Sequence, residues 1–130
     1  MSEPTPSPTV GVIISHAEVA AALVGAVRTI SGVSDALQAV SNEGCDPKAL
    51  AQRIEEAIGE RPAVLFVDLP GGSCLSSAVR LSRGRGERAV VTGVNLAMLL
   101  DFVFHRDVPP AEAAKRAVEA GSRAIRTPAA

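Results

Sequence analysis

Residues 10–16 read Val-Gly-Val-Ile-Ile-Ser-His, a short, continuous apolar run that ends at a serine and a histidine. Two similar runs follow over 62–67 and 88–91, and all three are rich in β-branched residues. Apolar residues that are continuous rather than alternating are typical of strands buried on both faces of a parallel sheet. The weaker segment 35–40, Asp-Ala-Leu-Gln-Ala-Val, fits a further strand near the sheet edge.

Helical patterns fill the segments between these runs. After the first run, apolar residues recur at a helical spacing at Val19, Leu23, Val27 and Ile30. In the next segment, Asp46 is expected to cap a helix that begins at Pro47 and ends at Gly59. The apolar face of this helix consists of Leu50, Ile54 and Ile58. Further helices are predicted over 73–81, 95–104 and 110–120, with Gly121 ending the last. Strands that alternate with helices predict an α/β fold with an open, mostly parallel sheet flanked by helices.

Composition and charge exclude several classes of protein. The 130 residues suit one domain, and 47% hydrophobic with 21% charged residues is typical of a globular chain. The 13 basic and 14 acidic residues leave a net charge of −1, which argues against a nucleic-acid-binding protein. Tyr and Trp are absent, so aromatic stacking platforms are not expected. Cys45 and Cys74 have no metal-ligand spacing and indicate reduced thiols in the cytoplasm.

The two ends of the chain differ from the rest. Residues 1–8 contain three prolines and lack the positive region and the long apolar stretch of a signal peptide or a membrane span. We therefore expect a disordered leader over 1–8, one domain over 9–127 and a tail over 128–130. The expected location is the cytoplasm, without direct insertion into a membrane.

The residues that follow each strand should form the functional site, because ligands of such sheets bind outside the carboxyl ends of the strands. Ser15 and His16 follow the first strand, the segment 68–73 follows the third, and Thr92-Gly93-Val94-Asn95 follows the fourth. These three segments are predicted to meet on one rim of the sheet.

His16 is the leading candidate for chemistry on this rim. Ser15-His16-Ala17-Glu18 has the form of a capping box, which predicts that Ser15 is an N-cap and that His16 lies in the first turn of a helix. There the helix dipole favours a neutral ring with a free lone pair, and it also favours a phosphate placed on that ring. A neutral imidazole is a nucleophile. The alternative is that His16 is simply a polar residue at a helix start.

Asp68 is the second candidate catalytic residue, and the candidate supporting residues are Ser15, Gly71, Gly72, Ser73 and Asn95. The carboxylate of Asp68 could accept a hydrogen bond from one ring nitrogen of His16, or it could only cap a turn. Glycines allow the backbone to approach a ligand, and Ser73 offers a hydroxyl and an N–H at a helix start, although a plain turn would also explain this segment. Asn95 is expected to be an N-cap first and a site residue second. The segment lacks the Lys of a phosphate-binding loop and the dinucleotide fingerprint, so neither ATP nor NAD is implied.

Other polar residues are weaker candidates for the same rim or for partner binding. Cys74 is close enough in sequence to line the site, but no neighbouring base favours a nucleophilic role. His105 is expected to be a solvated residue, or a partner of the helix dipole near a C-terminal helix end, rather than a catalytic residue. Arg83, Arg85 and Arg88 form a basic cluster near a loop, either solvated or facing an acidic partner.

Taken together, these segments resemble the mannose-type EIIA domain of the bacterial sugar phosphotransferase system. The matching pieces are Ser15-His16 after an apolar strand, Val67-Asp68-x-x-Gly71-Gly72-Ser73, and Gly93-Val94-Asn95-Leu96-x-Met98-Leu99. Their order and spacing agree over residues 9–127. A related phosphotransfer subunit of dihydroxyacetone kinase shares the Ser-His start but has a single Gly before its Ser, so Gly71-Gly72 favours the mannose type.

The resemblance implies a flavodoxin-like fold and a phosphocarrier function. His16 would accept a phosphoryl group from phospho-HPr and pass it to a histidine of an EIIB partner, with Asp68 supporting the ring and Ser73 with nearby N–H groups contacting the phosphoryl oxygens. The resemblance also implies a homodimer that exchanges a C-terminal strand, here within 122–126, and peripheral association with a membrane permease. No metal or cofactor is implied, because the phosphoryl group arrives already activated.

Three positions depart from the family pattern. Ala17 and Cys74 stand where the family usually has Gly and Pro, and Ala97 also replaces a usual Pro. These departures concern the rim that faces a partner. A second hypothesis is therefore a regulatory EIIA-like protein whose phosphorylation state controls a partner without sugar transport. A receiver domain phosphorylated on Asp68 is disfavoured, because the first strand is not followed by the acidic residues that hold Mg²⁺.

Overall fold

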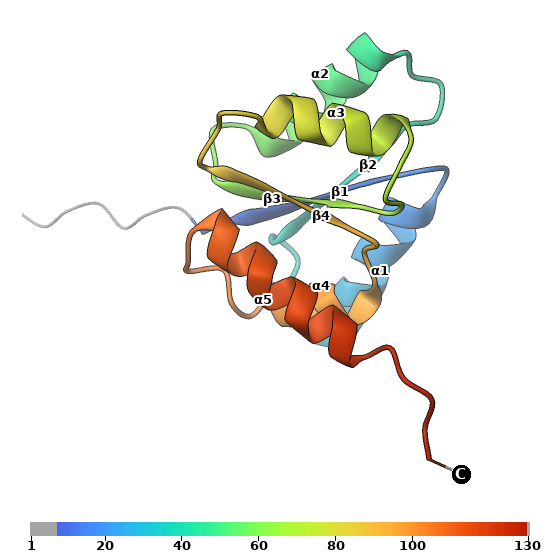
Figure 1. The fold of residues 1–130 in the computed structure, drawn as a ribbon, viewed down its shortest axis with the longest axis vertical. Helices are drawn as coiled ribbons and strands as arrows, with labels where there is room; N and C mark the ends of the chain where they lie inside the picture. Colours follow the sequence, from blue (N-terminus) through green and yellow to red (C-terminus); the bar gives the residue numbers. More distant parts are fainter. Residues whose placement is uncertain (1–7, 130) are drawn as a thin grey trace, which may run out of the picture.

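The computed structural model describes residues 8–129 and consists of one four-stranded parallel sheet flanked by five helices (Figure 1). The strands are β1 (Val10–Ser15), β2 (Leu37–Ser41), β3 (Ala63–Val67) and β4 (Arg88–Thr92), in the spatial order β2-β1-β3-β4. The helices are α1 (Val19–Ser31), α2 (Pro47–Ile58), α3 (Ser73–Ser82), α4 (Leu96–Phe102) and α5 (Pro110–Arg123). The predicted α/β architecture is thus confirmed.

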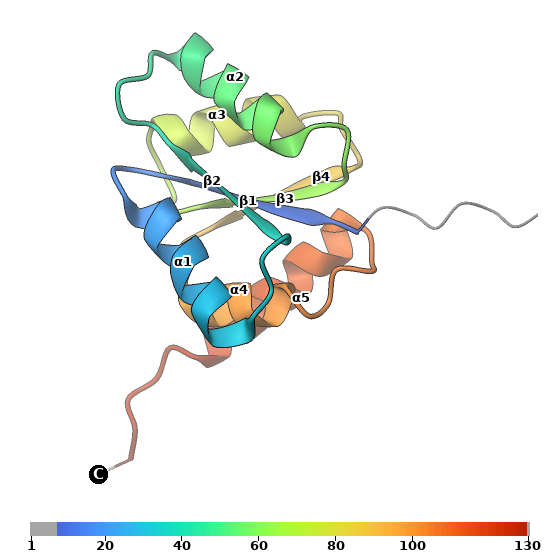
Figure 2. The same ribbon diagram turned by 180° about the vertical axis from the view of Figure 1, so that it is seen from behind.

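The helices form two layers, one on each face of the sheet (Figures 1 and 2). One layer, formed by α2 and α3, covers a core that includes Leu50, Ile54 and Ile58, the predicted apolar face of α2. The other layer, formed by α1, α4 and α5, covers a core around Phe66 and Phe102. Every residue of β1 and β3 is buried, because both strands are central and have helices on both faces. This explains why their sequences are continuously apolar.

Several predicted boundaries shift in the structure. The second strand begins at Leu37 rather than at residue 35, and it is an edge strand as predicted. Helix α4 is shorter than the predicted 95–104, whereas α5 continues past Gly121 to Arg123. Gly121 thus lies within the helix, where its lack of a side chain serves packing. A methyl group at this position would lie 2.7 Å from Cε of Met98. The prediction of a leader over 1–8 falls almost entirely on residues 1–7, which lie outside the described residues.

The apolar face predicted for α1 was wrong at both of its ends. Val19 and Ile30 are 44% and 61% exposed, whereas Ala20 and Val27 are the buried residues of this helix. The helix is therefore rotated, relative to the prediction, so that a small residue contacts the sheet near its start. Among residues 8–129, no helix is long and apolar enough to span a membrane.

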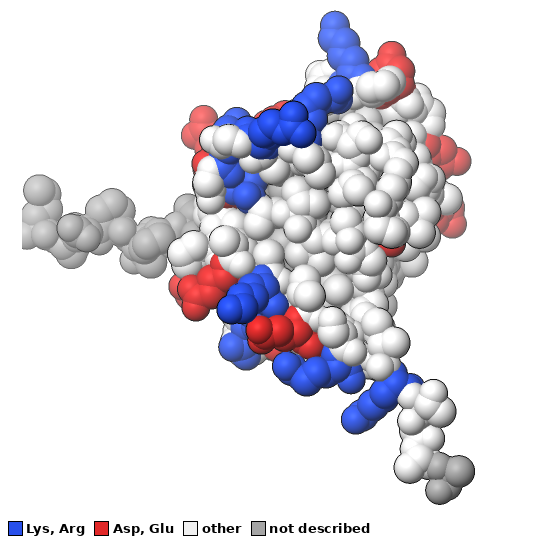
Figure 3. Space-filling model, viewed as in Figure 1, with Lys and Arg blue, Asp and Glu red and all other residues white. Residues whose placement is uncertain are grey.

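Arg88 does not belong to an exposed basic cluster, contrary to expectation. Its side chain is 2% exposed and is held by both carboxylate oxygens of Glu55 at 2.6 and 2.8 Å, and by the carbonyl oxygen of Leu81 at 2.8 Å. This bidentate pair ties β4 to α2, and the hydrogen bond from Arg88 lowers the pKa of Glu55. On the face drawn in Figure 3, basic side chains gather around the end of α3 and along α5.

Gly11 makes room for an aromatic pair in the core. The rings of Phe66 and Phe102 meet edge to face with their centroids 5.1 Å apart. A methyl group at Gly11 would lie 2.6 Å from Cδ2 of Leu37 and 2.8 Å from Cε1 of Phe102. Such contacts are too short, and the fully buried neighbours have little space into which they could move.

We expect Gly11→Ala to lower the free energy of unfolding by about 1–3 kcal/mol, the usual cost of overpacking a core. Gly25→Ala is the matched control, because a methyl group at Gly25 in α1 meets nothing within 4 Å. It should instead raise the stability by about 0.5–1 kcal/mol through helix propensity. Urea unfolding of both variants measures the two effects, and equal stability of the two variants would contradict the packing argument.

Candidate functional site

The site forms where β1 and β3, two adjacent strands, end side by side. The register pairs Ile14 with Val67, so that His16 and Asp68 leave the same edge of the sheet. The main-chain N–H of Asp68 donates to the carbonyl oxygen of Ile14 at 3.3 Å, which continues the pairing to the start of the loop. The helices that follow β1 and β3 cover opposite faces of the sheet, so this edge is the switch point at which such folds bind ligands.

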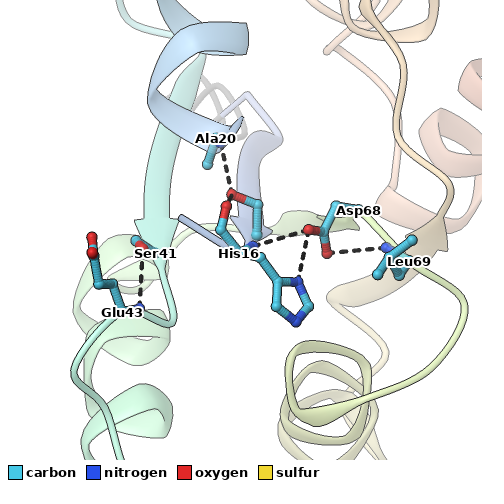
Figure 4. A network of polar contacts seen from close by, with 7 residues as sticks. His16, Ala20, Ser41, Glu43, Asp68 and Leu69 are labelled. Atoms are coloured by element: carbon cyan, nitrogen blue, oxygen red, sulfur yellow. Dashed lines mark hydrogen bonds and ion pairs between the residues drawn. The ribbon is translucent and has the colours of Figure 1, made fainter. Parts of the chain in front are cut away.

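His16 is held by one carboxylate oxygen through two hydrogen bonds (Figure 4). Oδ2 of Asp68 lies 2.9 Å from the main-chain N of His16 and 2.9 Å from Nδ1 of its ring. The other oxygen, Oδ1, accepts from the main-chain N–H of Leu69 at 3.0 Å. With its backbone and ring fixed by the same atom, the imidazole has a defined orientation.

This contact also determines which ring nitrogen is free. An ionised carboxylate only accepts hydrogen bonds, so Nδ1 carries a proton, and in the neutral ring the lone pair is then on Nε2. In Figure 4, Nε2 points away from Asp68, and no residue between 8 and 129 hydrogen-bonds to it. The His16 side chain is 44% exposed, against 13% for Asp68. A nucleophilic nitrogen therefore faces the surface, supported from behind by a mostly buried carboxylate.

Asp68 stays ionised because its hydrogen bonds outweigh its burial. Burial alone raises the pKa of this carboxyl group. The hydrogen bonds from the main chain and ring of His16, together with that from Leu69, lower the pKa, and the net shift is below the ordinary value. The group is therefore a carboxylate at neutral pH, able to stabilise positive charge on the ring.

The predicted capping box is absent from the structure. Ser15 is the last residue of β1, and α1 begins only at Val19, with Glu18 as an N-cap that makes no side-chain hydrogen bond. His16 thus lies in a turn before the helix and not in its first turn. The hydroxyl of Ser15 instead accepts from the main-chain N–H of Ala20 at 2.7 Å, so Ser15 anchors the helix start from the strand. Its role is to position the turn that carries His16.

Ala17 has a backbone conformation that favours glycine. Its φ angle is +48°, and it is the only non-glycine residue between 8 and 129 with a positive φ. An L-residue in this region costs about 1–2 kcal/mol. The strained residue directly follows His16, where the family resemblance had suggested Gly.

We expect Ala17→Gly to raise the free energy of unfolding by roughly 0.5–1 kcal/mol, because relief of strain exceeds the added flexibility of the unfolded chain. Ala22→Gly, an exposed position within α1, is the control and should lower stability by about 0.5–1 kcal/mol. Thermal unfolding measures both. A loss of stability in Ala17→Gly would contradict the strain argument.

Gly71, Gly72 and Ser73 form the turn between β3 and the start of α3. Gly72 has φ +90° and provides no side-chain cap, while Ser73 is the first residue of the helix and is exposed. The N–H groups of the first turn of a helix have no partner within the helix, and its dipole is positive there. This end of α3 can therefore hold an anion placed near His16.

Asn95 is not available to the site through its side chain. Its Oδ1 caps α4 by accepting from the main-chain N–H of Met98 at 3.0 Å. Its Nδ2 donates to the carbonyl oxygen of Gly121 at 3.1 Å, which joins α4 to the end of α5. The first of its two predicted roles, that of an N-cap, is the one the structure shows.

Cys74 is closer to the centre of the site than the sequence indicated. It is the second residue of α3 and is fully buried, and one ligand atom from each of Cys74, His16 and Asp68 lies within 4.8 Å of the others. Burial and the charge of Asp68 both raise the pKa of the thiol, which keeps it protonated at neutral pH. Cys74 lies four positions before Ala78, so both residues are on the same face of α3, and both are buried. This spacing was the sequence signal that Cys74 faces inward.

The fold matches several solved structures of phosphotransferase components. An EIIA component from Streptococcus agalactiae has a TM-score of 0.84 at 16% identity, covering 92% of this chain and 96% of that one. A mannose/sorbose-specific IIA subunit from Enterococcus faecalis has a TM-score of 0.80 at 19% identity, covering 95% and 97%. A sigma-54 interaction domain protein from Enterococcus faecalis has a TM-score of 0.72 at 12% identity, covering 95% and 96%. At such identities these likenesses establish the fold alone.

Sequence comparison identifies the family. A search among curated proteins found no significant match. The sequence profile of the EIIA-man family, described as the PTS system fructose IIA component, matches residues 11–119 and so includes His16, Asp68 and all of the sheet except Val10. Because this match spans most of the 130 residues, the chain belongs to the mannose-type EIIA family of the sugar phosphotransferase system.

Proposed function

We propose that this protein is a phosphocarrier that accepts a phosphoryl group from phospho-HPr on Nε2 of His16 and passes it to a histidine of an EIIB partner in sugar uptake. The observation that carries this proposal is the pairing of His16 with Asp68, which leaves Nε2 free on the exposed side of the ring. Membership of the EIIA family supports a phosphocarrier role in the sugar phosphotransferase system.

The transfer exchanges one phosphorus–nitrogen bond for another. Nε2 of His16 attacks the phosphorus, the bond to the donor histidine breaks, and the donor nitrogen keeps the electron pair. Because Nδ1 retains its proton, the phosphorylated ring of His16 carries a positive charge, which the adjacent carboxylate of Asp68 neutralises. The reaction requires mainly positioning and charge stabilisation from the protein.

The start of α3 is proposed to hold the phosphoryl oxygens. Ser73 and the N–H groups of the first turn lie next to Cys74, whose sulfur is within 4.8 Å of a ligand atom of His16 and of Asp68. The turn of Gly71 and Gly72 has open space around it, so a phosphoryl group can approach the backbone. Ser15 contributes indirectly, through its anchoring of α1.

The surface around His16 suits a protein partner rather than a small molecule. Leu69 is 53% exposed and Val19 is 44% exposed, and Ala17 and Pro70 beside them are exposed as well. This mostly apolar rim, which also carries the exposed Glu18, would be covered by HPr or EIIB during transfer, which would also exclude water from the phosphoryl group. Figure 3 shows a broad uncharged surface between the charged groups of α3 and α5.

We also propose that two copies of this chain form a homodimer. Residues 124–129 form no strand in the single chain, and Val118 and Ile125 are 45% and 76% exposed. Strand β4 has a partner only on its β3 side, so a segment of a second chain could add to its free edge. Exchange of the 122–126 segment would require the end of α5, at Ser122 and Arg123, to unwind.

The test is phosphorylation by labelled phosphoenolpyruvate in the presence of enzyme I and HPr. We expect a single labelled residue, with a label that is stable in base and labile in acid, as expected for a phosphorus–nitrogen bond. Peptide mapping should place it on the peptide that contains His16. A label that is stable in acid, or one that maps elsewhere, would refute the proposal.

A regulatory role is the second candidate, and one observation favours it. A structural neighbour with a TM-score of 0.72 is described as a sigma-54 interaction domain protein, so this fold also occurs in that context. Both functions need His16 and Asp68, but only the carrier passes its label on. Genes for EIIB and membrane EIIC components beside this one would favour sugar uptake, and their absence would favour regulation.

A further inference from the structure

The side chains of His16, Asp68 and Cys74 present nitrogen, oxygen and sulfur to one small volume. One ligand atom of each lies within 4.8 Å of the other two. We propose that these three residues bind a zinc ion, and that zinc and the phosphoryl group exclude each other at His16. The second half of this inference rests on the proposed phosphocarrier function, whereas the first half does not.

The distances suit a tetrahedral ion after a small adjustment. Zinc bonds of about 2.0–2.3 Å place neighbouring ligand atoms roughly 3.3–3.8 Å apart. Nδ1 of His16 and Oδ2 of Asp68 are 2.9 Å apart, and the ligand atoms of the three residues all lie within 4.8 Å of one another. An ion between the three groups would lengthen the shortest of these separations. The adjustment falls on side chains, and Gly71 and Gly72, just before Cys74, have open space around them.

The kind of ligands selects the metal. Mg²⁺ and Ca²⁺ prefer oxygen ligands, whereas a set with one thiolate and one imidazole favours zinc. Three protein ligands leave the fourth position for water, and the exposed side of His16 provides access for it. Cys74 is fully buried, so its sulfur is shielded from solvent and oxidants while it is bound.

Zinc binding would remove the nucleophile. If the ion replaces the proton on Nδ1, the remaining ring proton must lie on Nε2, which then has no lone pair for phosphorus. If the ion binds Nε2 instead, it occupies the nucleophilic nitrogen itself. In both cases the Cys74 proton is released to solvent. The hydrogen bond from Nδ1 to Asp68 is lost in the first case, whereas in the second case Nδ1 keeps its proton and can still donate to the carboxylate. Conversely, a phosphorylated His16 lacks the free nitrogen that zinc needs.

The first experiment measures binding without any phosphoryl donor. The untagged, metal-free full-length protein is titrated with Co²⁺, which reports a thiolate ligand by charge-transfer absorption in the near ultraviolet, and then with Zn²⁺ by calorimetry. We expect this absorption, its displacement by zinc, and one zinc ion per chain. Cys74→Ala should abolish the absorption and weaken zinc binding at least 10–100-fold, the range known for lesser changes around a metal site.

Cys45→Ala is the matched control, because Cys45 lies in the loop after β2, contacts the carbonyl oxygens of Ser41 and Glu43, and is outside the cluster. It should bind both metals as the unchanged protein does. Absence of thiolate absorption in the unchanged protein overturns the proposal, and this result does not depend on whether the Cys74 variant folds. Equal absorption in Cys74→Ala overturns it as well.

The second experiment tests the exclusion. Zinc-loaded protein should not be labelled by phospho-HPr, and chelation should restore labelling. Because zinc could act on enzyme I or HPr, labelling of Cys74→Ala is measured with and without the same zinc concentration and should not change. Labelling of the zinc-loaded protein would overturn the exclusion. If the protein is never labelled, with or without zinc, the phosphocarrier function fails while the metal site stands on the spectroscopic result.

Discussion

A protein in which His16 is replaced by alanine is expected to take up no phosphoryl group from phospho-HPr. The imidazole supplies the atom placed for attack, because Nε2 is free while Nδ1 is engaged by Asp68. Its loss should reduce labelling to background, an effect of at least several thousand-fold on the rate, comparable with loss of a nucleophile in other enzymes. The measurement is the initial rate of labelling at fixed concentrations of enzyme I and HPr.

His105→Ala is the matched control for this variant. His105 is the other histidine of the chain, and its ring contacts the carbonyl oxygen of Asp101 at 2.8 Å and Nη2 of Arg116 at 2.9 Å. His105 precedes Arg106, whose carbonyl oxygen accepts a hydrogen bond from the main-chain N–H of Thr9. Because Thr9 lies just before β1 and His16 just after it, His105 is at the opposite end of the strands from His16. This variant should be labelled at the unchanged rate. Residual labelling of His16→Ala above background would show that another residue carries the phosphoryl group.

The fold was predictable because long-range packing and local pattern agree in this chain. The buried strands β1 and β3 are continuously apolar, and α2 has both its cap and its apolar face in the sequence. Prediction failed where a tertiary contact overrode a local pattern. The capping box at Ser15 is one example: Ser15 pairs with Ser41 of β2, and its carbonyl oxygen accepts from Asn42 at 3.0 Å, which keeps it in the strand.

The candidate site was partly predictable for the same reason. Parallel strands end at one edge, so the proximity of the segments after β1 and β3 follows from the order of elements. The sequence could not show that one oxygen of Asp68 holds both the backbone and the ring of His16. Nor could it show how close the thiol of Cys74 lies to this pair, although the spacing of Cys74 from Ala78 was a signal that it faces inward. Arg88 is a similar case, since its partner Glu55 is 33 residues away.

Asp68→Ala is expected to slow phosphoryl transfer to His16 about 100-fold while the protein stays folded. The variant loses a hydrogen bond to a charged group, which is worth roughly 1.5–3 kcal/mol, and with it the charge that balances the phosphorylated ring. Asp68→Asn separates these two contributions. Its amide oxygen can still accept from the main chain and Nδ1 of His16, so the tautomer is kept and only the charge is lost.

We therefore expect Asp68→Asn to slow transfer only about 10-fold, since a neutral hydrogen bond is weaker than a charged one by roughly 1–1.5 kcal/mol. The control is Asp46→Ala, which removes a carboxylate that only caps a helix, through a hydrogen bond of 2.7 Å from the main-chain N–H of Ala49. It should lower stability by about 0.5–2 kcal/mol and leave the transfer rate unchanged. If Asp68→Ala behaved in the same way, Asp68 would be a structural cap. The graded order of rates, unchanged protein above Asn above Ala, is expected only if the carboxylate both orients the ring and stabilises its charge.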